Sequence, residues 1–418
     1  MREMKNSGTE WLSDIPHDWT LSNIGSLYTM RNVKVSDRDY PPLSVTMKGV
    51  VPQLETAAKT DAHDDRKLVR KGDFAINSRS DRRGSCGIAD RDGSVSLINT
   101  ILAPRTKMNP DYYNWLFHST SFADEFYRWG HGIVDDLWTT RWQEMKKIDV
   151  PVPSYEEQAQ IASTLETECT KVDALIANQE TQIEKLKAYK QSLITEVVTK
   201  GLDPNVPMKD SGVEWIGLIP KHWNTIATKY LFRIESGATP KSENPEYFDG
   251  DIPWITPADY KTEEVFVFGG RRNISELGLK SCSTTLIPKG SLIFSKRAPI
   301  GAVAINAEEL CTNQGCLSCI PKTEDIVKYY YYVMSVCTEQ YNLLGSGTTF
   351  KEISATNFAN FVLPNPSVSE QEEMVAYLDE KCSKVDRLIA IKNAKIDKLN
   401  KYKKSLIYEY VTGKKEVM

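Results

Sequence analysis

Two short motifs carry residue types that could do chemistry on DNA, and both are incomplete. Residues 244–247 read Asn-Pro-Glu-Tyr, close to the Asn/Asp-Pro-Pro-aromatic loop with which DNA adenine methyltransferases hold an extruded base. A glutamate replaces the second proline, and no glycine-rich cofactor turn lies between a strand and a helix. Asp111 with Glu144 and Lys146 loosely fits the Asp…Glu-x-Lys pattern of metal-dependent nucleases. Such spacings arise often by chance, so neither motif predicts a catalytic residue.

A group of cysteines comes closest to a metal site. Cys316 and Cys319 form a C-x-x-C with Cys311 nearby, whereas a structural zinc site usually needs four ligands. No second Cys/His pair follows at a suitable spacing, and the five histidines are dispersed. These cysteines are therefore predicted to be buried strand residues. Since the sequence also has no GxxxxGK phosphate loop, it predicts that this chain binds no metal and no cofactor.

The composition limits the class of protein. A chain of 418 residues is too long for one core and predicts two to four domains. The net charge is −4, so any nucleic acid must be bound by local basic patches. No apolar run approaches the ~20 residues that cross a bilayer, and the N-terminus lacks the apolar stretch of a signal peptide. We therefore expect a cytoplasmic protein without a membrane partner, whose cysteines stay reduced.

The strongest feature is an internal repeat. The segment SGTEWLSDIPHDW at residues 7–19 recurs as SGVEWIGLIPKHW at residues 211–223. We call these two segments the markers. Each marker is followed by a block of domain size, about residues 20–150 and 224–363. Short strands joined by glycine turns predict that each block is an α+β domain with a largely antiparallel sheet.

A long helix follows each block. Residues 154–201 contain no internal proline or glycine, open with the capping-box pair Ser154 and Glu157, and stop at Gly201. Residues 367–412 repeat this pattern. Apolar residues at 4-3 spacing predict a heptad seam along which the two helices pack on each other. The predicted seam consists of Val172, Ile176, Ile183, Leu186, Leu193 and Val197 in the first helix and Val385, Ile389, Ile396, Leu399 and Leu406 in the second.

Polar residues interrupt the seam at Gln179, Lys190 and Lys403. Such residues can fix the register of two helices at a cost in stability. The whole order predicts five segments: marker and first globular domain (1–150), first long helix (151–201), linker (202–212), second globular domain with its marker (213–363) and second long helix (364–418).

This layout and its motifs resemble the specificity subunit of type I restriction-modification systems, over the whole chain. Residues 237–240 (GATP) and 247–257 (YFDGDIPWITP), followed by Asp259, are similar to the family's GxTP…GDIPWITPxD run. Residues 295–301 (SKRAPIG) and 311–315 (CTNQG) resemble two further family stretches. The first block lacks the GxTP and IPWI motifs, so its contact residues are less defined.

The resemblance implies a non-catalytic protein. Two α+β target-recognition domains, each with a small, twisted, largely antiparallel sheet, would each recognise half of a bipartite site in double-stranded DNA. The long helices would form an antiparallel coiled coil, giving an internal pseudo-two-fold repeat. That coiled coil would hold the domains apart and dock two methyltransferase subunits, and motor-nuclease subunits would join this core. S-adenosylmethionine, ATP and Mg²⁺ would be bound by the partner subunits.

DNA recognition would require Arg, Asn or Gln against base edges and Lys, Ser or Thr on phosphates. The candidates are Arg79, Ser80, Arg82 and Arg83 in the first domain, and Thr239, Lys241, Lys296, Arg297, Thr349 and Lys351 in the second. For each of them, the alternative is a solvated surface residue or one that only shapes a loop. Arg271 and Arg272, beside two glycines, are predicted to form only a basic turn.

Two other classes of function stay open at this point. A stand-alone DNA methyltransferase or nuclease would need the catalytic motifs that are incomplete here. A coiled-coil scaffold for protein partners would explain the helices, but not two different arginine-bearing domains of similar size.

Overall fold

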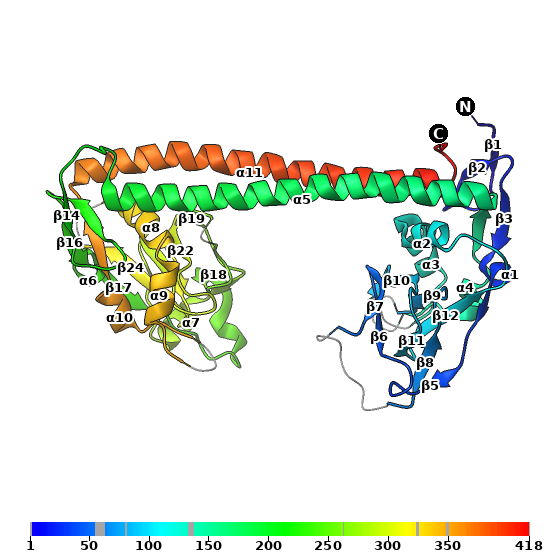
Figure 1. Ribbon diagram of the computed structural model, residues 1–418. Coiled ribbons are helices and arrows are strands. Elements are labelled where there is room, and N and C mark those ends of the chain that lie inside the picture. Colours follow the sequence, from blue (N-terminus) through cyan, green and yellow to red (C-terminus); the bar gives the residue numbers. More distant parts are fainter. Residues whose placement is uncertain are drawn as a thin grey trace. The chain divides into compact units, whose positions relative to one another are not determined.

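The two runs without internal proline or glycine form two long helices. Helix α5 spans Tyr155–Lys200 (46 residues) and α11 spans Val368–Val411 (44 residues). The computed structural model describes residues 2–54, 63–79, 82–132, 138–261, 263–322, 326–347 and 351–417 (Figure 1). The hydroxyl oxygen of Ser154 accepts a hydrogen bond from the Glu157 N–H at 3.2 Å, and Ser367 caps α11 in the same way at 3.4 Å. Gly201 follows α5 with a φ of +78°, a left-handed conformation that glycine adopts easily.

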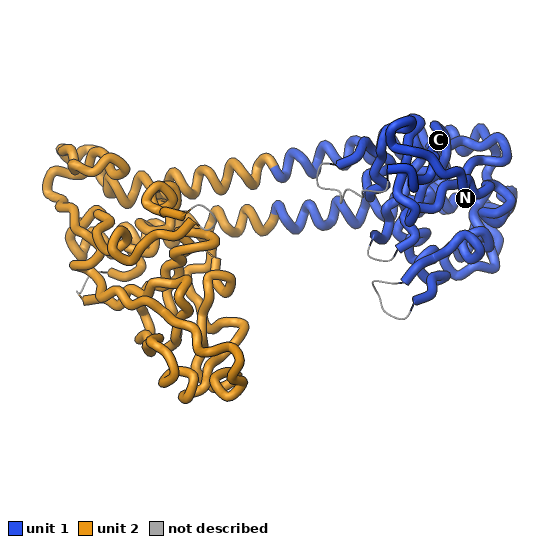
Figure 2. Tube along the Cα trace, turned by 90° about the horizontal axis from the view of Figure 1, so that it is seen from below, with its two compact units in different colours: residues 1–180, 392–418 blue, residues 181–391 orange. Residues whose placement is uncertain are grey.

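The chain divides into two compact units, and each long helix contributes to both. Unit 1 comprises residues 1–180 and 392–418, and unit 2 comprises residues 181–391 (Figure 2). Unit 1 therefore contains the first marker, the first globular domain, the beginning of α5 and the end of α11. Unit 2 contains the second marker, the second globular domain, the end of α5 and the beginning of α11. None of the helices in the described ranges has the length and apolar character of a membrane span.

Unit 1 is built from short antiparallel strands covered by helices. Its strands are β1 (Met4–Asn6), β2 (Asp14–Pro16), β3 (Thr20–Asn23), β4 (Tyr28–Met30), β5 (Lys34–Val35), β6 (Leu43–Thr46), β7 (Gly49–Pro52), β8 (Arg66–Val69), β9 (Phe74–Asn77), β10 (Cys86–Ile88), β11 (Gly93–Ser96), β12 (Asn99–Pro104) and β13 (Asp149–Val152). Its short helices are α1 (Ile24–Leu27), α2 (Pro110–His118), α3 (Thr120–Arg128) and α4 (Trp142–Met145). The largest sheet has the order β10-β9-β12-β4, a second has the order β11-β8-β5, and β6 and β7 form a hairpin. All pairs in these three sheets are antiparallel.

The core of unit 1 is rich in aromatic side chains. Phe74 of β9 packs on Phe117 of α2 with ring centroids 4.3 Å apart, and Phe117 packs on Phe122 of α3 at 4.7 Å. Helix α2 begins because Asn109 accepts hydrogen bonds from the first backbone N–H groups and Pro110 occupies the first turn. Burial of these rings fixes α2 and α3 against the largest sheet.

The largest sheet of unit 2 has five strands, one more than the largest sheet of unit 1. Its strands are β14 (Met208–Asp210), β15 (Leu218–Pro220), β16 (Asn224–Ala227), β17 (Phe232–Ser236), β18 (Phe248–Ile255), β19 (Phe266–Val267), β20 (Arg272–Ile274), β21 (Leu292–Ser295), β22 (Val303–Asn306), β23 (Cys311–Thr312), β24 (Cys316–Pro321) and β25 (Val362–Asn365). Its short helices are α6 (Thr228–Leu231), η3 (Pro245–Tyr247), α7 (Glu276–Ser281), α8 (Val327–Ser335), α9 (Thr338–Leu344) and α10 (Ala355–Ala359). The five-stranded sheet has the order β17-β24-β21-β22-β19, and a three-stranded sheet has the order β20-β18-β23.

The predicted fold class, two α+β domains with two long packed helices, is confirmed. The sheets of unit 2 are antiparallel except for the short pairs β19–β22 and β18–β23, which are parallel. Cys311, Cys316 and Cys319 lie buried in β23 and β24. Burial raises the pKa of the Cys316 thiol to about 12, so this thiol stays protonated at neutral pH. Among the described residues, no three His, Cys, Asp or Glu side chains form a possible metal site.

The two long helices pack on each other in both units, and each predicted seam residue is buried or half-buried. In unit 1, Lys403 of α11 donates to Asp173 of α5 with both Nζ–Oδ distances 2.7 Å. In unit 2, Lys190 of α5 donates to Asp386 of α11 at the same distances. In the internal repeat Asp173 corresponds to Asp386 and Lys190 to Lys403, so one interaction is made twice with the helices exchanged. The early part of α5 meets the late part of α11, which is an antiparallel arrangement.

Each marker joins the beginning of one long helix to the end of the other. In unit 1 the buried indole of Trp19 donates from Nε1 to Glu157 Oε2 at 2.8 Å, in the first turn of α5. Arg2 also binds the carboxylate of Glu157. Gly413, just after α11, lies so close to the marker that a Cβ there would be 2.4 Å from Cγ of Pro16. The repeated Trp, Glu and Gly positions therefore form one structural junction.

Unit 2 has the same junction with one different partner. Trp223 Nε1 donates to Glu370 Oε1 at 2.9 Å, and Gly201 at the end of α5 packs against the Trp223 ring. His222, which corresponds to Asp18 in the first marker, lies with Nε2 2.8 Å from Glu370 Oε1. In unit 2, a histidine of the marker thus contacts the carboxylate of Glu370, which is equivalent to the Glu157 carboxylate that Arg2 contacts in unit 1.

The Glu370 junction predicts a loss of stability in acid. Burial acts to raise the pKa of Glu370, but hydrogen bonds from His222, Ser367 and Trp223 outweigh it and lower the pKa from 4.5 to about 2. A carboxylate with a lowered folded-state pKa contributes stability that is complete above its unfolded pKa and is lost as pH falls through the folded value. Unit 2 should therefore lose this contribution between pH 4.5 and about 2. Hydrogen exchange across this range should show a weaker pH dependence for Glu370→Gln, and an identical profile would contradict the assignment.

Candidate nucleic-acid interface

Five loops of unit 2 lie together at the ends of strands, and four of them contain the motifs noted in the sequence. We call them the loop cluster, and they comprise residues 237–240, 254–259, 269–271, 295–301 and 311–315. The first loop contacts the fifth closely, because a Cβ at Gly237 would lie 2.2 Å from the carbonyl oxygen of Thr312. The Ala238 N–H also donates to Thr312 O at 3.0 Å. Trp254 donates from Nε1 to Ala238 O at 3.1 Å, which joins the second loop to the first.

The fifth loop lies at the centre of the cluster. Its Asn313 N–H donates to Ile255 O at 2.9 Å, and Gly315 O accepts from the Lys296 N–H at 3.0 Å. Gln314 is exposed, and its Oε1 accepts a hydrogen bond from the Thr239 hydroxyl. This bond orients the Gln314 side chain, and its amide NH₂ group, a double donor, has no hydrogen-bond partner among the described residues. The arrangement presents polar side chains on a rigid backbone, as recognition of a base edge requires.

Glu352 pairs with both basic candidates of the fourth loop. Lys296 Nζ lies 2.8 Å from Glu352 Oε1, and its side chain is only 15% exposed. Arg297 Nη1 lies 3.7 Å from Glu352 Oε2. Both cations share one carboxylate, so the three side chains together keep a single net positive charge. Sequence reasoning could not identify this partner, which is more than fifty positions away from them.

In unit 1 an open groove of about 520 Å³ contains Arg79, one of the predicted candidates. Its lining includes Lys67, Ser78, Arg79, Thr139, Arg141 and Gln143. Arg79 and Arg141 are exposed, and no described residue pairs with either guanidinium group. Lys67 instead donates from Nζ to the carbonyl oxygen of Asn99 at 2.7 Å. The sequence pattern indicated Arg79 but missed Arg141 and Gln143, which lie at the start of the short helix α4 and match no motif.

Arg79 and Arg297 occupy equivalent places in the two units. Each forms an isolated antiparallel bridge with a residue of a later loop, Arg79 with Thr139 and Arg297 with Glu352. The residues just before the two arginines make equivalent hydrogen bonds. Ser78 O accepts from the Thr140 N–H at 3.0 Å, and Lys296 O accepts from the Ile353 N–H at 3.1 Å. The same backbone therefore carries an arginine without a described partner in unit 1 and an arginine that is paired with a carboxylate in unit 2. The difference lies in one position, which is threonine in unit 1 and glutamate in unit 2.

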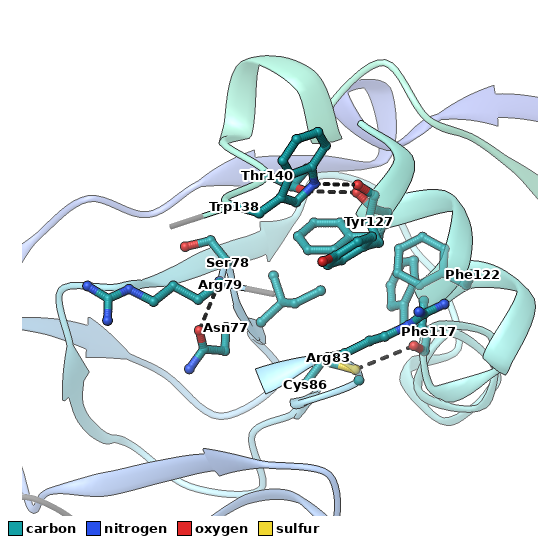
Figure 3. Close-up of a pocket in the computed structure, with 14 residues that line it drawn as sticks. Asn77, Ser78, Arg79, Arg83, Cys86, Phe117, Phe122, Tyr127, Trp138 and Thr140 are labelled. Atoms are coloured by element: carbon teal, nitrogen blue, oxygen red, sulfur yellow. Dashed lines mark hydrogen bonds between the residues drawn. The ribbon is translucent and has the colours of Figure 1, made fainter. Parts of the chain in front are cut away.

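Arg83 takes no part in that groove. Its guanidinium pairs with Asp124 of α3 and lies 5.3 Å from the centre of the Tyr127 ring. Arg79 and Arg83 both border a closed cavity of about 10 Å³, which has room for one water molecule and not for a base (Figure 3). Figure 3 shows Arg79 extending away from the aromatic side chains and Arg83 lying along them. Arg83 is therefore better placed to hold α3 than to contact a ligand.

The remaining candidates are exposed or undescribed. Lys241 and Lys351 are exposed. The Arg82 N–H donates to Arg79 O at 3.3 Å, within the loop that follows β9. Ser80 and Thr349 lie outside the described residues. The structure thus separates the predicted set into cations without a described side-chain partner (Arg79, Lys241 and Lys351) and cations paired with carboxylates (Arg83, Lys296 and Arg297).

Comparison with known proteins points to one family. A family model described as the type I restriction modification DNA specificity domain matches residues 220–401. The chain is 39% identical over 166 residues to the type I restriction enzyme MjaIX specificity subunit of Methanocaldococcus jannaschii, covering 39% of this chain and 38% of that protein. It is 26% identical over 435 residues to the MjaVIII specificity subunit of the same organism, covering 96% and 93%. The matched part spans 38% and 60% of the lengths of the MjaIX and MjaX specificity subunits.

Solved structures share the fold. A chain from a study of complex assembly and conformational transition of the type I restriction-modification system aligns with a TM-score of 0.73 at 15% identity, covering 96% of this chain and 99% of that one. The HsdS subunit from Thermoanaerobacter tengcongensis aligns with a TM-score of 0.51 at 16% identity, covering 98% and 99%. At these identities the likeness concerns the arrangement of two β-rich domains and two long helices.

Proposed function

Because the chain belongs to the family of type I restriction-modification specificity subunits, we propose that it selects the DNA sequence on which a methyltransferase and restriction complex acts. Each globular domain would recognise one half of a two-part site in double-stranded DNA, with unread base pairs between the halves. The chain itself would perform no catalysis. S-adenosylmethionine, ATP and Mg²⁺ would be bound by partner subunits.

One observation carries this proposal most directly. The two units repeat the same junctions and the same bridges, yet they present different side chains at equivalent positions: Thr139 beside Arg79 in one unit and Glu352 beside Arg297 in the other. Equal scaffolds with unequal surfaces are expected when two domains bind DNA in the same manner and recognise different sequences. A coiled-coil scaffold for protein partners would not require that difference.

The helices would also fix the spacing between the half-sites. Helix α5 has 46 residues, which at 1.5 Å per residue is about 69 Å, comparable to two turns of DNA. The ion pairs Asp173–Lys403 and Lys190–Asp386 support a single register, because a shift by one residue would separate both pairs. A fixed helix pair of this length would give an unread gap of constant size.

Two equivalent exposed patches support the docking of two methyltransferase copies. Leu175 and Tyr402 flank the Asp173–Lys403 pair in unit 1 and are 46% and 49% exposed. Leu388 and Tyr189, their counterparts in the repeat, flank the Lys190–Asp386 pair in unit 2 and are 47% and 55% exposed. Large apolar side chains at matching places on a solvated helix pair favour an interface with a protein. Because the patches are equivalent, they fit two copies of the same partner.

Changing one patch should remove one methyltransferase copy. Leu175→Glu combined with Tyr402→Glu, or Leu388→Glu with Tyr189→Glu, places two charges in an apolar contact and should lower the mass of the complex by one methyltransferase subunit in native mass spectrometry. Lys185→Glu, on an exposed part of α5, serves as the control and should leave the mass unchanged. A complex of full mass with either double variant would contradict docking at these patches.

Giving Arg79 a carboxylate partner should weaken the binding of DNA. Thr139→Glu copies the Glu352 arrangement of unit 2 and should pair with Arg79, which lies across the bridge. Since one good arginine contact is worth about 1–3 kcal/mol, we expect the Kd of the methyltransferase complex for its cognate DNA to rise roughly tenfold or more. Thr139→Ser, which keeps the hydroxyl, is the matched control. Equal Kd values for the two variants at the same salt concentration would contradict a contact from Arg79.

The whole proposal is tested by sequencing the methylated positions in cells that express this chain with its methyltransferase partner. We expect a motif of two specific parts with an unread gap of constant length. Replacing residues 20–150 by the corresponding domain of another specificity subunit should change one part of the motif and preserve the other. A continuous motif, or methylation by this chain without a partner, would overturn the proposal.

A further inference from the structure

Asp259 is a buried carboxylate on the turn after β18. Its side chain is only 3% exposed. One oxygen, Oδ2, accepts hydrogen bonds from the Thr256 N–H at 2.7 Å and from the Thr256 hydroxyl at 2.6 Å. The other oxygen, Oδ1, accepts from the Arg271 N–H at 3.1 Å and from Arg271 Nε at 2.9 Å. The carboxylate therefore joins two loops of the loop cluster.

The backbone before Arg271 is fitted to the same turn. A Cβ at Gly270 would lie 2.2 Å from the carbonyl oxygen of Trp254, so this position requires glycine. The close approach brings the Arg271 N–H to Asp259. The close packing of Gly270 and the hydrogen bond from the Arg271 N–H fix the backbone of Arg271. The hydrogen bond from Arg271 Nε fixes the direction of its side chain.

Asp259 stays ionised in this setting. Burial acts to raise the pKa of Asp259, but the hydrogen bonds from Thr256 and Arg271 outweigh it and the pKa is lowered. A charged acceptor holds the Nε–H of Arg271 more strongly than a neutral one. The orientation of the guanidinium plane is therefore maintained at neutral pH.

The bond to Asp259 uses only the inner nitrogen of the guanidinium group. The two terminal nitrogens make no hydrogen bond to any residue that the structure describes, and the side chain is 74% exposed. Two parallel N–H groups at the end of an oriented arginine match O6 and N7 of guanine in the major groove, the commonest specific contact in protein–DNA complexes. Since the side chain is already ordered, less conformational freedom is lost on binding.

The neighbouring arginine has a different environment. The guanidinium of Arg272 lies 3.8 Å from the centre of the Phe248 ring, and its Nε is 3.8 Å from Asp249 Oδ1. Among the described residues, its carboxylate partner is Asp249, whose side chain is 81% exposed, and no buried carboxylate orients it. Arg272 is therefore a matched control for Arg271, with the same charge and the adjacent position in the chain.

We infer that Arg271 contacts a guanine in the half-site recognised by unit 2, and that Asp259 is its positioning residue. The inference rests on the proposed function, because it takes unit 2 as a DNA-binding unit. It differs from the prediction that residues 271 and 272 form only a basic turn. It also places a specificity-determining residue in the same cluster as Gln314, whose amide is oriented by Thr239.

The test uses the full chain in complex with its methyltransferase, acting on a DNA library in which each position of the recognised site is randomised. Arg271→Lys keeps the positive charge but cannot make the double contact. We expect the preference for guanine to fall roughly 10- to 100-fold at one position of one half-site, with every other position unchanged. Arg272→Lys should change no position.

Asp259→Asn tests the positioning role. Its amide can satisfy Thr256 or Arg271 with its single oxygen, but not both, so the arginine is kept while its orientation is lost. We expect the preference for guanine to weaken at the same position as with Arg271→Lys. A purely structural role of Asp259 would instead lower methylation of all sequences equally.

Three results would overturn the assignment of Arg271: unchanged preferences with Arg271→Lys, a loss that is equal for all sequences, or a wild-type half-site without a G·C pair. A wild-type complex that recognises no two-part site would instead overturn the proposed function itself. The wild-type measurement, made first, distinguishes these failures.

Discussion

Replacing Trp19 with alanine should lower the free energy of unfolding of unit 1 by about 3–5 kcal/mol, the usual cost of removing a large aromatic side chain from a core. Trp19 is 1% exposed, and its indole contacts both long helices through Glu157 and Gly413. The loss should therefore reach beyond the marker to the first turn of α5 and the end of α11. Hydrogen exchange that is resolved by segment will measure it separately for each unit.

Two variants separate the causes of this loss. Trp19→Phe keeps an aromatic ring but removes the N–H that donates to Glu157, and hydrogen bonds to charged groups contribute about 1.5–3 kcal/mol. Met47→Ala, at a side chain that is 72% exposed, should change little. We expect unit 2 to keep its stability in all three variants, because it has its own junction at Trp223. An equal loss in both units would show that the junctions are not independent.

Replacing Gln158 with leucine is the second change with a large expected effect. The side chain is 3% exposed, its Oε1 accepts from the Asn109 N–H at 2.8 Å, and its Nε2 donates to Pro153 O at 2.9 Å. Leucine fills a similar volume but leaves a buried N–H and a buried carbonyl unpaired, at about 1–3 kcal/mol each. We expect unit 1 to lose about 2–6 kcal/mol, measured by urea unfolding.

Gln160→Leu is the matched control, because Gln160 is exposed on the same turn of α5 and its replacement should be nearly neutral. Gln371→Leu should repeat the Gln158 effect in unit 2. Gln371 is fully buried and accepts from the Ile326 N–H at 2.8 Å. Similar stabilities for the Gln158 and Gln160 variants would show that water replaces the missing partners.

The long helices could be predicted from the sequence because their signals are local. Capping serines, a closing glycine and 4-3 spacing all lie within the segments they describe, and α5 begins one residue after Ser154. The repeat added information, because two copies of the same junction residues exclude coincidence. The α+β class of the globular domains followed from short strands between glycine turns for the same reason.

The interface residues were harder to predict, because the pairing and orientation of each charged side chain depend on residues that are distant in the sequence. Lys296 and Arg297 have the composition of a basic loop, but Glu352 lies beside both of them. Arg271 has the composition of a simple turn, but a buried aspartate twelve positions earlier orients it. A sequence pattern shows which cations are present, whereas the fold determines which of them are paired with a carboxylate.

The last turns of α11 have a consequence for the order in which the protein can fold during synthesis. Leu406, Tyr410 and Val411 belong to the core of unit 1, and the Tyr112 hydroxyl donates to Val411 O at 2.9 Å. Unit 2 is a continuous segment and can fold once residue 391 has been translated, while unit 1 must wait for residues 392–418, which are translated after unit 2. A premature stop codon after residue 391 would therefore damage the first globular domain, although that domain is translated before unit 2.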